Sequence, residues 1–97
     1  MDRARVAAIG LVSIAAAAGA ASAEPPAGAT SCSGCHTSSA RAQSPVPRLA
    51  GLDRAAIVKA MEEFRSGARP GTVMDRIAKG FTDPEIQAIA AWYASQK

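Results

Sequence analysis

The sequence has few metal-ligating and aromatic side chains. Its 97 residues include one histidine and two cysteines, and 4% are aromatic. A structural zinc site needs about four ligands, so only carboxylates could complete one here. The sequence contains no G-x-G-x-x-G loop after a strand, which excludes a dinucleotide-binding βαβ unit. The formal net charge of +3 comes without the clustered basic face that nucleic-acid binding requires.

The first 23 residues have the composition of a signal peptide. Arg3 and Arg5 form a basic start, Val6 to Ala21 is uncharged, and Ala21-Ser22-Ala23 matches an A-x-A cleavage site. A retained membrane anchor is the alternative, but a spanning helix needs about 20 predominantly apolar residues. We therefore expect cleavage before Glu24, export to the periplasm and no membrane span afterwards.

The only cysteines and the only histidine share one pentapeptide, Cys32-Ser33-Gly34-Cys35-His36. Its pattern, C-x-x-C-H, is the attachment sequence of a c-type haem. Each cysteine sulfur adds to one haem vinyl group, and the following histidine is held under the iron as the proximal ligand. The spacing predicts one haem c attached through Cys32 and Cys35, with His36 as an iron ligand.

Three other uses of this pentapeptide stay open. A disulfide between Cys32 and Cys35 would close a very small loop and leave His36 without a role. A thioredoxin-like dithiol acts in a βαβ setting, and zinc would need carboxylate ligands. Because covalent haem attachment is a periplasmic reaction in bacteria, the export signal favours haem over all three.

Residues 24–97 are predicted to form one small all-α monohaem domain. A domain of this size buries little apolar surface and often needs a staple. Haem would be that staple, so we expect the haem-free chain to be largely unfolded. Pro25, Pro26 and Gly28 shorten any helix before the haem motif, and residues 37–47 are expected to form a loop.

An amphipathic helix is predicted after this loop. Asp53 is placed as its N-cap, and Gly67 follows Ser66 as a C-terminal stop. Apolar residues recur at i, i+3, i+4 and i+7: Ile57, Ala60, Met61 and Phe64.

The last helix is predicted to open at Thr82. Thr82 and Glu85 match the T-x-x-E capping box, and Pro84 is tolerated in the first turn. Trp92 lies beside the apolar face of this helix, which should pack against the N-terminal segment and the haem. The residues of that face are Ile86, Ile89, Ala90 and Tyr93.

Met74 is the predicted sixth ligand of the iron. It follows the turn Arg69-Pro70-Gly71-Thr72, so the backbone can aim its thioether. Met61 lies on a helical apolar stripe and is expected to pack. The alternative is that Met74 is a core residue and the iron is open or held otherwise. Bis-histidine ligation from this chain is excluded, because no second histidine exists.

The order of these features resembles the class I cytochromes c over nearly all of residues 24–97: haem motif, P-x-L-x-G loop, amphipathic helix, methionine loop and aromatic C-terminal helix. The resemblance implies about four short helices around one covalently bound haem. It also implies that the Pro47 carbonyl receives the N–H of His36, and that Met74 binds iron.

More narrowly, Met61-Glu62-Glu63-Phe64-Arg65-Ser66-Gly67 and Ile77-Ala78-Lys79-Gly80-Phe81 resemble the cytochrome subunits of flavocytochrome c sulfide dehydrogenases. Weaker forms occur in periplasmic dihaem cytochromes. Some of these subunits carry two haem domains, whereas this chain has one C-x-x-C-H.

His36 and Met74 together would fill both axial positions, which disfavours oxygen or peroxide chemistry. Met/His ligation raises the reduction potential, as suits a one-electron acceptor. The resemblance implies sulfide oxidation on a separate flavoprotein carrying FAD, with electrons passing through this haem to a downstream redox protein. The chain itself would then have no catalytic residues. A free-standing monohaem shuttle and a haem-free thiol or metal protein remain as alternatives.

Overall fold

The structure is a computed structural model that describes residue 10 and residues 24–96. The predicted signal peptide, residues 1–23, lies outside the described residues except for Gly10. The described elements are α1 (Ala29–Cys32), α2 (Arg54–Ser66), α3 (Met74–Ile77), the 3-10 turn η1 (Ala78–Gly80) and α4 (Asp83–Ser95). This part of the chain is helical and contains no strand, which confirms the predicted all-α class.

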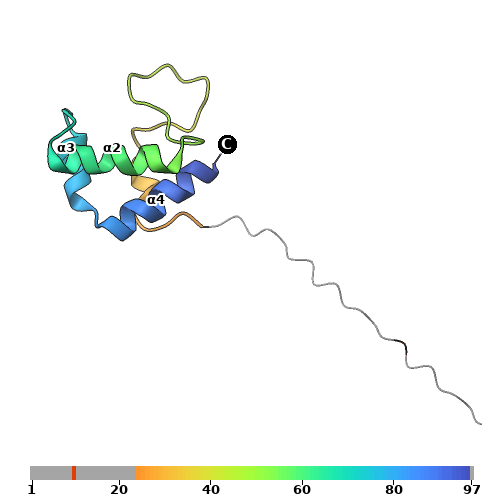
Figure 1. The fold of residues 1–97 in the computed structure, drawn as a ribbon. Coiled ribbons are helices and arrows are strands. Elements are labelled where there is room, and N and C mark those ends of the chain that lie inside the picture. The colour runs from red at the N-terminus through yellow and green to blue at the C-terminus, as the bar shows by residue number, and fades with distance from the viewer. Residues whose placement is uncertain (1–9, 11–23, 97) are drawn as a thin grey trace, which may run out of the picture.

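Helix α2 is the element on which the others are assembled. It packs against α4, α3 and η1, and Figure 1 shows α4 crossing it with α3 at its far end. The Asp53 carboxylate accepts a hydrogen bond from the Ala56 amide at 3.1 Å, so the predicted N-cap is confirmed. Gly67 ends the helix in the left-handed conformation, with φ 84°. Both ends of α2 were therefore encoded by local signals.

Helix α4 begins as the sequence predicts. The Thr82 hydroxyl accepts a hydrogen bond from the Glu85 amide at 3.4 Å and donates one to the Glu85 carboxylate at 2.8 Å. Pro84 occupies the first turn, where its missing N–H leaves no helical hydrogen bond unmade. Along the helix, the predicted face is buried: Ile86, Ile89, Ala90 and Tyr93.

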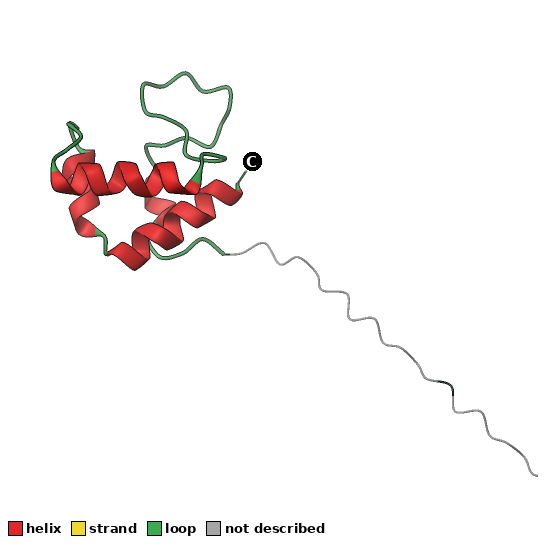
Figure 2. Cartoon of the chain, viewed as in Figure 1, coloured by secondary structure: helices red, strands yellow, loops and turns green. Residues whose placement is uncertain are grey.

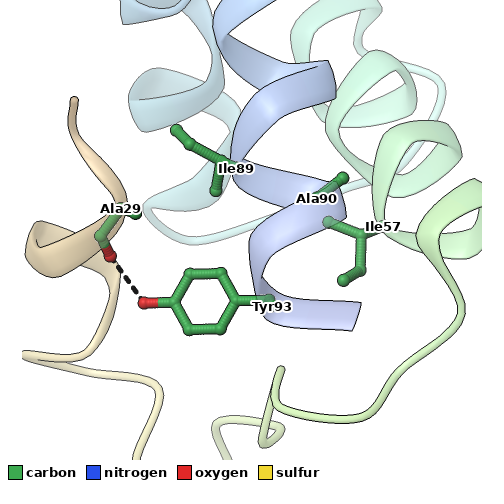
Figure 3. Packing of buried hydrophobic residues seen from close by; sticks show 5 residues of the cluster. All are labelled: Ala29, Ile57, Ile89, Ala90 and Tyr93. Atoms are coloured by element: carbon green, nitrogen blue, oxygen red, sulfur yellow. Dashed lines mark hydrogen bonds between the residues drawn. The ribbon is translucent and has the colours of Figure 1, made fainter. Parts of the chain in front are cut away.

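The core is small and joins α1 to α4 and α2 (Figure 3). Its buried cluster consists of Ala29, Ile57, Ile89, Ala90 and Tyr93. The partly buried side chains of Leu49, Phe81 and Trp92 pack around it. Such a core is slight for an independent domain, and the expectation that haem adds to it stays a prediction.

Helix α1 has only four residues, as Pro25 and Pro26 predict. Gly28 precedes it with φ 85°, and a Cβ atom there would lie 2.6 Å from the Phe81 ring. A larger residue at this position would therefore force either the Phe81 ring or the backbone before α1 to move.

Residues 37–47 form the predicted loop, which extends away from the helices in Figure 2. Its residues are mostly exposed. Within the described residues, no helix combines the length and apolar character needed to cross a bilayer.

Candidate functional site

The pentapeptide 32–36 is wound into tight turns at the end of α1. The amides of His36 and Cys35 both donate to the Cys32 carbonyl, at 2.9 Å and 3.2 Å. These turns bring the two thiols and the imidazole into one short stretch of coiled backbone. Both cysteines are free thiols, Cys32 half-buried and Cys35 exposed, so the two sulfurs are not joined in a disulfide.

Burial raises the pKa of the Cys32 thiol above its ordinary value of 9.0, outweighing the lowering effect of the hydrogen bond from Ser31. The group is therefore held as a thiol rather than a thiolate. Its sulfur donates weakly to the Gly28 carbonyl at 3.7 Å, which orients it on the core side of α1.

His36 is oriented by the loop that follows it. Its Nδ1 atom lies 2.6 Å from the Pro47 carbonyl oxygen. Because a carbonyl can only accept, Nδ1 carries the proton in this hydrogen bond, and Nε2 keeps a lone pair for a metal. A partner of this kind is what holds a ligating histidine in one orientation. The contact predicted between His36 and Pro47 is confirmed.

A second hydrogen bond closes the base of the same loop. Arg48 Nε donates to the Ser38 carbonyl oxygen at 3.0 Å. This bond and the His36–Pro47 bond both connect the beginning of the loop to its end. Sequence reasoning missed Arg48, because nothing in the local pattern indicates which carbonyl a loop arginine reaches.

Tyr93 connects α4 to two segments, one before the pentapeptide and one after the loop that follows it. Its hydroxyl donates to the Ala29 carbonyl at 2.5 Å, and its own carbonyl accepts from the Gly51 amide at 3.0 Å. Burial raises the pKa of the Tyr93 hydroxyl above its ordinary value of 10.0, which keeps this donor protonated. The sequence predicted the packing of Tyr93 but not these bonds. A buried tyrosine usually has a hydroxyl partner, and that rule was the available signal.

Met74 is the first residue of α3, so it begins a helical turn after the turn that it was expected to follow. Its side chain is half-buried, and so is that of Met61 on α2. Burial therefore does not separate the two methionines. No hydrogen bond joins Met74 to the pentapeptide among the described residues, and the assignment of Met74 to iron stays a prediction.

Exposed apolar side chains border the candidate ligand segments. Three large hydrophobic residues of the described chain are exposed, Leu52 to 42%, Val73 to 53% and Ile77 to 40%. Leu52 lies five residues after Pro47, and the other two lie on either side of Met74 in the sequence. An apolar macrocycle carrying iron fits the chemistry of these residues: two free thiols, an imidazole whose Nδ1 is engaged by Pro47, and exposed apolar side chains close in sequence to Pro47 and Met74.

The described residues offer little to other metals. No group of three or more His, Cys, Asp and Glu side chains is arranged among them to hold a metal ion.

Comparisons with known proteins identify the group of proteins to which this chain is related. No protein-family model matches the sequence. The cytochrome subunit of sulfide dehydrogenase from Chlorobaculum tepidum is 38% identical over 65 residues, which cover 67% of this chain and 59% of that protein. The thiosulfate dehydrogenase electron acceptor of Stutzerimonas stutzeri is 42% identical over 65 residues, covering 65% of this chain but 30% of the relative. The chain thus spans less than two thirds of the length of either relative.

A third relative is closer to this chain in size. Cytochrome c-554(548) of Halomonas halodenitrificans is 32% identical over 70 residues, covering 68% of this chain and 84% of that protein. The matched proteins are c-type cytochromes and act in electron transfer. Their similarity, the C-x-x-C-H turn and the all-α fold show that the chain belongs to the class I cytochromes c.

Proposed function

We propose that residues 24–97 form a periplasmic monohaem cytochrome that accepts electrons from a sulfide-oxidising flavoprotein, after cleavage of residues 1–23 as a signal peptide. The observation that carries the haem assignment is the 2.6 Å contact between His36 Nδ1 and the Pro47 carbonyl inside a C-x-x-C-H setting. When bound, haem c supplies a one-electron Fe(III)/Fe(II) couple.

The residues of this chain take four roles in the proposal. Cys32 and Cys35 would hold the cofactor through two thioether bonds, each formed by adding one S–H group across one haem vinyl group. His36 would offer Nε2 to the iron, while the Pro47 carbonyl holds the proton on Nδ1. Met74 would offer its thioether as the second iron ligand from the chain. With two iron ligands supplied by the chain, the site would be suited to electron transfer rather than to binding oxygen or substrate.

Two observations support a dehydrogenase as the electron donor. The names of two relatives connect them to sulfide dehydrogenase and to thiosulfate dehydrogenase. The stretches 61–67 and 77–81 also resemble the cytochrome subunits of flavocytochrome c sulfide dehydrogenases. The FAD-carrying subunit would be a separate polypeptide, and a downstream redox protein would receive the electrons.

A free-standing electron shuttle is the second candidate. The observation that favours it is the similarity to the small cytochrome from Halomonas halodenitrificans, 84% of which the match covers. A shuttle makes small, transient redox contacts, so its reactions should be salt-sensitive and its complexes short-lived.

Haem attachment is tested on the exported protein by mass spectrometry. We expect the mature chain to carry one haem that survives acid-acetone extraction. A secreted protein with the mass of the bare peptide would overturn the proposal.

The partner is tested by purifying the exported holoprotein under mild conditions from its native source. Co-purification with a flavin-containing subunit, and sulfide-dependent reduction of the haem only in its presence, would support the dehydrogenase assignment. A holoprotein that elutes alone from a sizing column, and that is reduced equally well without the flavoprotein, would select the shuttle.

A further inference from the structure

The segment that carries Met74 is held at its two ends by three consecutive residues of α2. We call residues 67–82, which lead from α2 to α4, the methionine segment; it contains α3 and η1 (Figure 1). Glu63 and Phe64 hold its entry, and Arg65 holds its exit. These three residues lie at the centre of the stretch 61–67, none of whose residues has a part in the proposed electron transfer.

At the entry, Arg69 is bonded to Glu63 through both side chain and backbone. Its Nε and Nη2 atoms lie 2.8 Å from Glu63 Oε2, and its amide donates to the Glu63 carbonyl at 3.1 Å. Lys59 pairs with the other oxygen of the same carboxylate. The hydrogen bonds from Lys59 and then Arg69 lower the pKa of the Glu63 carboxyl. The Glu63 carboxylate thus pairs with both Lys59 and Arg69, and the pair with Arg69 connects α2 to the start of the methionine segment.

The Phe64 ring packs against the same turn. A Cβ atom built on Gly71 would lie 3.1 Å from the Phe64 ring, so the backbone at 71 is already in close contact with it. The guanidinium of Arg69 lies over that ring, 5.5 Å from its centroid, within cation–π range. The turn before Met74 is therefore packed on an aromatic ring as well as ion-paired.

At the exit, Arg65 joins the segment to the start of α4. Its Nη1 donates to the Phe81 carbonyl at 3.4 Å, and its Nη2 pairs with Asp83, the first residue of α4. Glu63 and Arg65 lie on either side of Phe64 in the sequence, and their charges are of opposite sign. An arginine–carboxylate pair thus lies at each end of the segment. At the entry α2 supplies the carboxylate, and at the exit α2 supplies the arginine.

We propose that Glu63-Phe64-Arg65 is a brace that restricts opening of the methionine segment and thereby keeps the Met74 thioether on the haem iron. The inference rests on the proposed ligation by Met74. Glu63, Arg65 and Arg69 are positioning residues, because none of them touches the cofactor in this scheme.

The brace should act on local opening more than on global stability. Its side chains are partly exposed: Glu63 to 25%, Arg65 to 32% and Arg69 to 46%. Exposed ion pairs change the overall unfolding equilibrium little. Opening of a short segment is a smaller event than unfolding, so the same pairs weigh more heavily in it.

The test uses the oxidised holoprotein and added imidazole, which binds iron only where the methionine has left it. The variants are Arg69→Gln, Arg65→Gln and the double variant. Arg54→Gln is the matched control, because Arg54 lies on the same helix and bonds Gln87 of α4 at 3.0 Å, away from the methionine segment. Hydrogen exchange of the amides in residues 67–82 is measured on the same samples.

We expect each single variant to bind imidazole about three- to fivefold more tightly and the double variant about tenfold more tightly, as loss of one or two partly exposed pairs implies. Amide exchange should quicken in residues 67–82 and stay unchanged in α2. Arg69→Lys, which keeps the charge but loses the two-pronged geometry, should lie between wild type and Arg69→Gln. Salt should tighten imidazole binding in wild type and have little effect in the double variant.

Imidazole binding in Arg65→Gln and Arg69→Gln that is the same as in Arg54→Gln would overturn the brace, and Met74 ligation would survive. Loss of the proposed ligation gives a different result. In that case wild type lacks the Met-to-iron absorption band, or Met74→Ala retains it, and the brace falls with it.

Discussion

The two sides of the candidate haem site are held by different forces. On the histidine side, Cys32 to Gly51 is fastened by hydrogen bonds to backbone carbonyls, from His36 to Pro47 and from Arg48 to Ser38. On the methionine side, residues 67–82 have hydrogen bonds to carbonyls as well, but ion pairs from α2 are added at both ends. Hydrogen bonds to carbonyls respond little to salt, whereas exposed ion pairs are screened by it. The histidine should therefore be the constant ligand and the methionine the exchangeable one.

Removing the attachment residues should have the largest effect on both sides. In Cys32→Ser/Cys35→Ser we expect no covalent haem and no cooperative thermal transition, because the described chain buries only seven hydrophobic residues, five of which form the central cluster. Circular dichroism and mass spectrometry of the exported chain check this. A haem-free variant that melts cooperatively would show that the small core is sufficient alone.

Replacing Met74, the proposed second iron ligand, should have the next largest effect. Met74→Ala is expected to abolish the Met-to-iron absorption band and lower the reduction potential, since Met/His ligation raises the potential relative to other axial sets. Met61→Ala should leave the band and cost about 1–3 kcal/mol of stability, less than a fully buried methionine would, because its side chain is half-buried. Spectra, redox titration and denaturant unfolding of both variants are the measurements; the opposite pattern would exchange the roles of the two methionines.

Tyr93 joins the histidine side to α4, and its loss should be intermediate. Tyr93→Phe removes the bond to the Ala29 carbonyl and should cost about 1–3 kcal/mol, because that buried acceptor loses its partner. Burial raises the pKa of Tyr93 in the folded chain. The contribution of the Tyr93 hydroxyl to folding stability is therefore present below pH 10.0, the ordinary pKa. It is lost as the pH rises through the higher pKa of the folded chain.

The pH dependence separates this bond from simple packing. Unfolding measured from pH 8 to 11 should show a stability loss at the alkaline end in wild type that is reduced in Tyr93→Phe. Parallel curves for the two proteins would mean that the hydroxyl is not the titrating group.

The smallest expected effect concerns the exposed loop. Arg48→Gln removes the second hydrogen bond at the base of the loop and should lower stability by roughly 0.5–1.5 kcal/mol, as one exposed hydrogen bond implies. Amide exchange should quicken in residues 37–47 while imidazole binding stays at the wild-type value. Tighter imidazole binding in this variant would erase the contrast between the two sides.

Local signals made the helices predictable. Asp53, Gly67, Thr82 and Pro84 mark helix ends through hydrogen bonds or torsion angles within a few residues, and the structure places α2 and α4 where they indicate. The His36–Pro47 contact was predictable only through the family resemblance, because it spans a loop of irregular backbone.

The ties that hold the site together were not predictable in the same way. Tyr93 meets a carbonyl 64 positions away in the sequence, and Arg65 meets Asp83 across the methionine segment. Such contacts depend on how the helices pack, which periodicity does not specify. The start of α3 at Met74 was missed for a related reason: a one-turn helix has too few residues to show a period.

The measurement that tests the account most directly is NMR of the reduced holoprotein with isotope-labelled methionine methyl groups. We predict one methyl signal strongly shifted by the haem ring current, absent in Met74→Leu and retained in Met61→Leu. A shifted signal that persists in Met74→Leu, or no shifted methyl in wild type, would contradict an iron held between His36 and Met74.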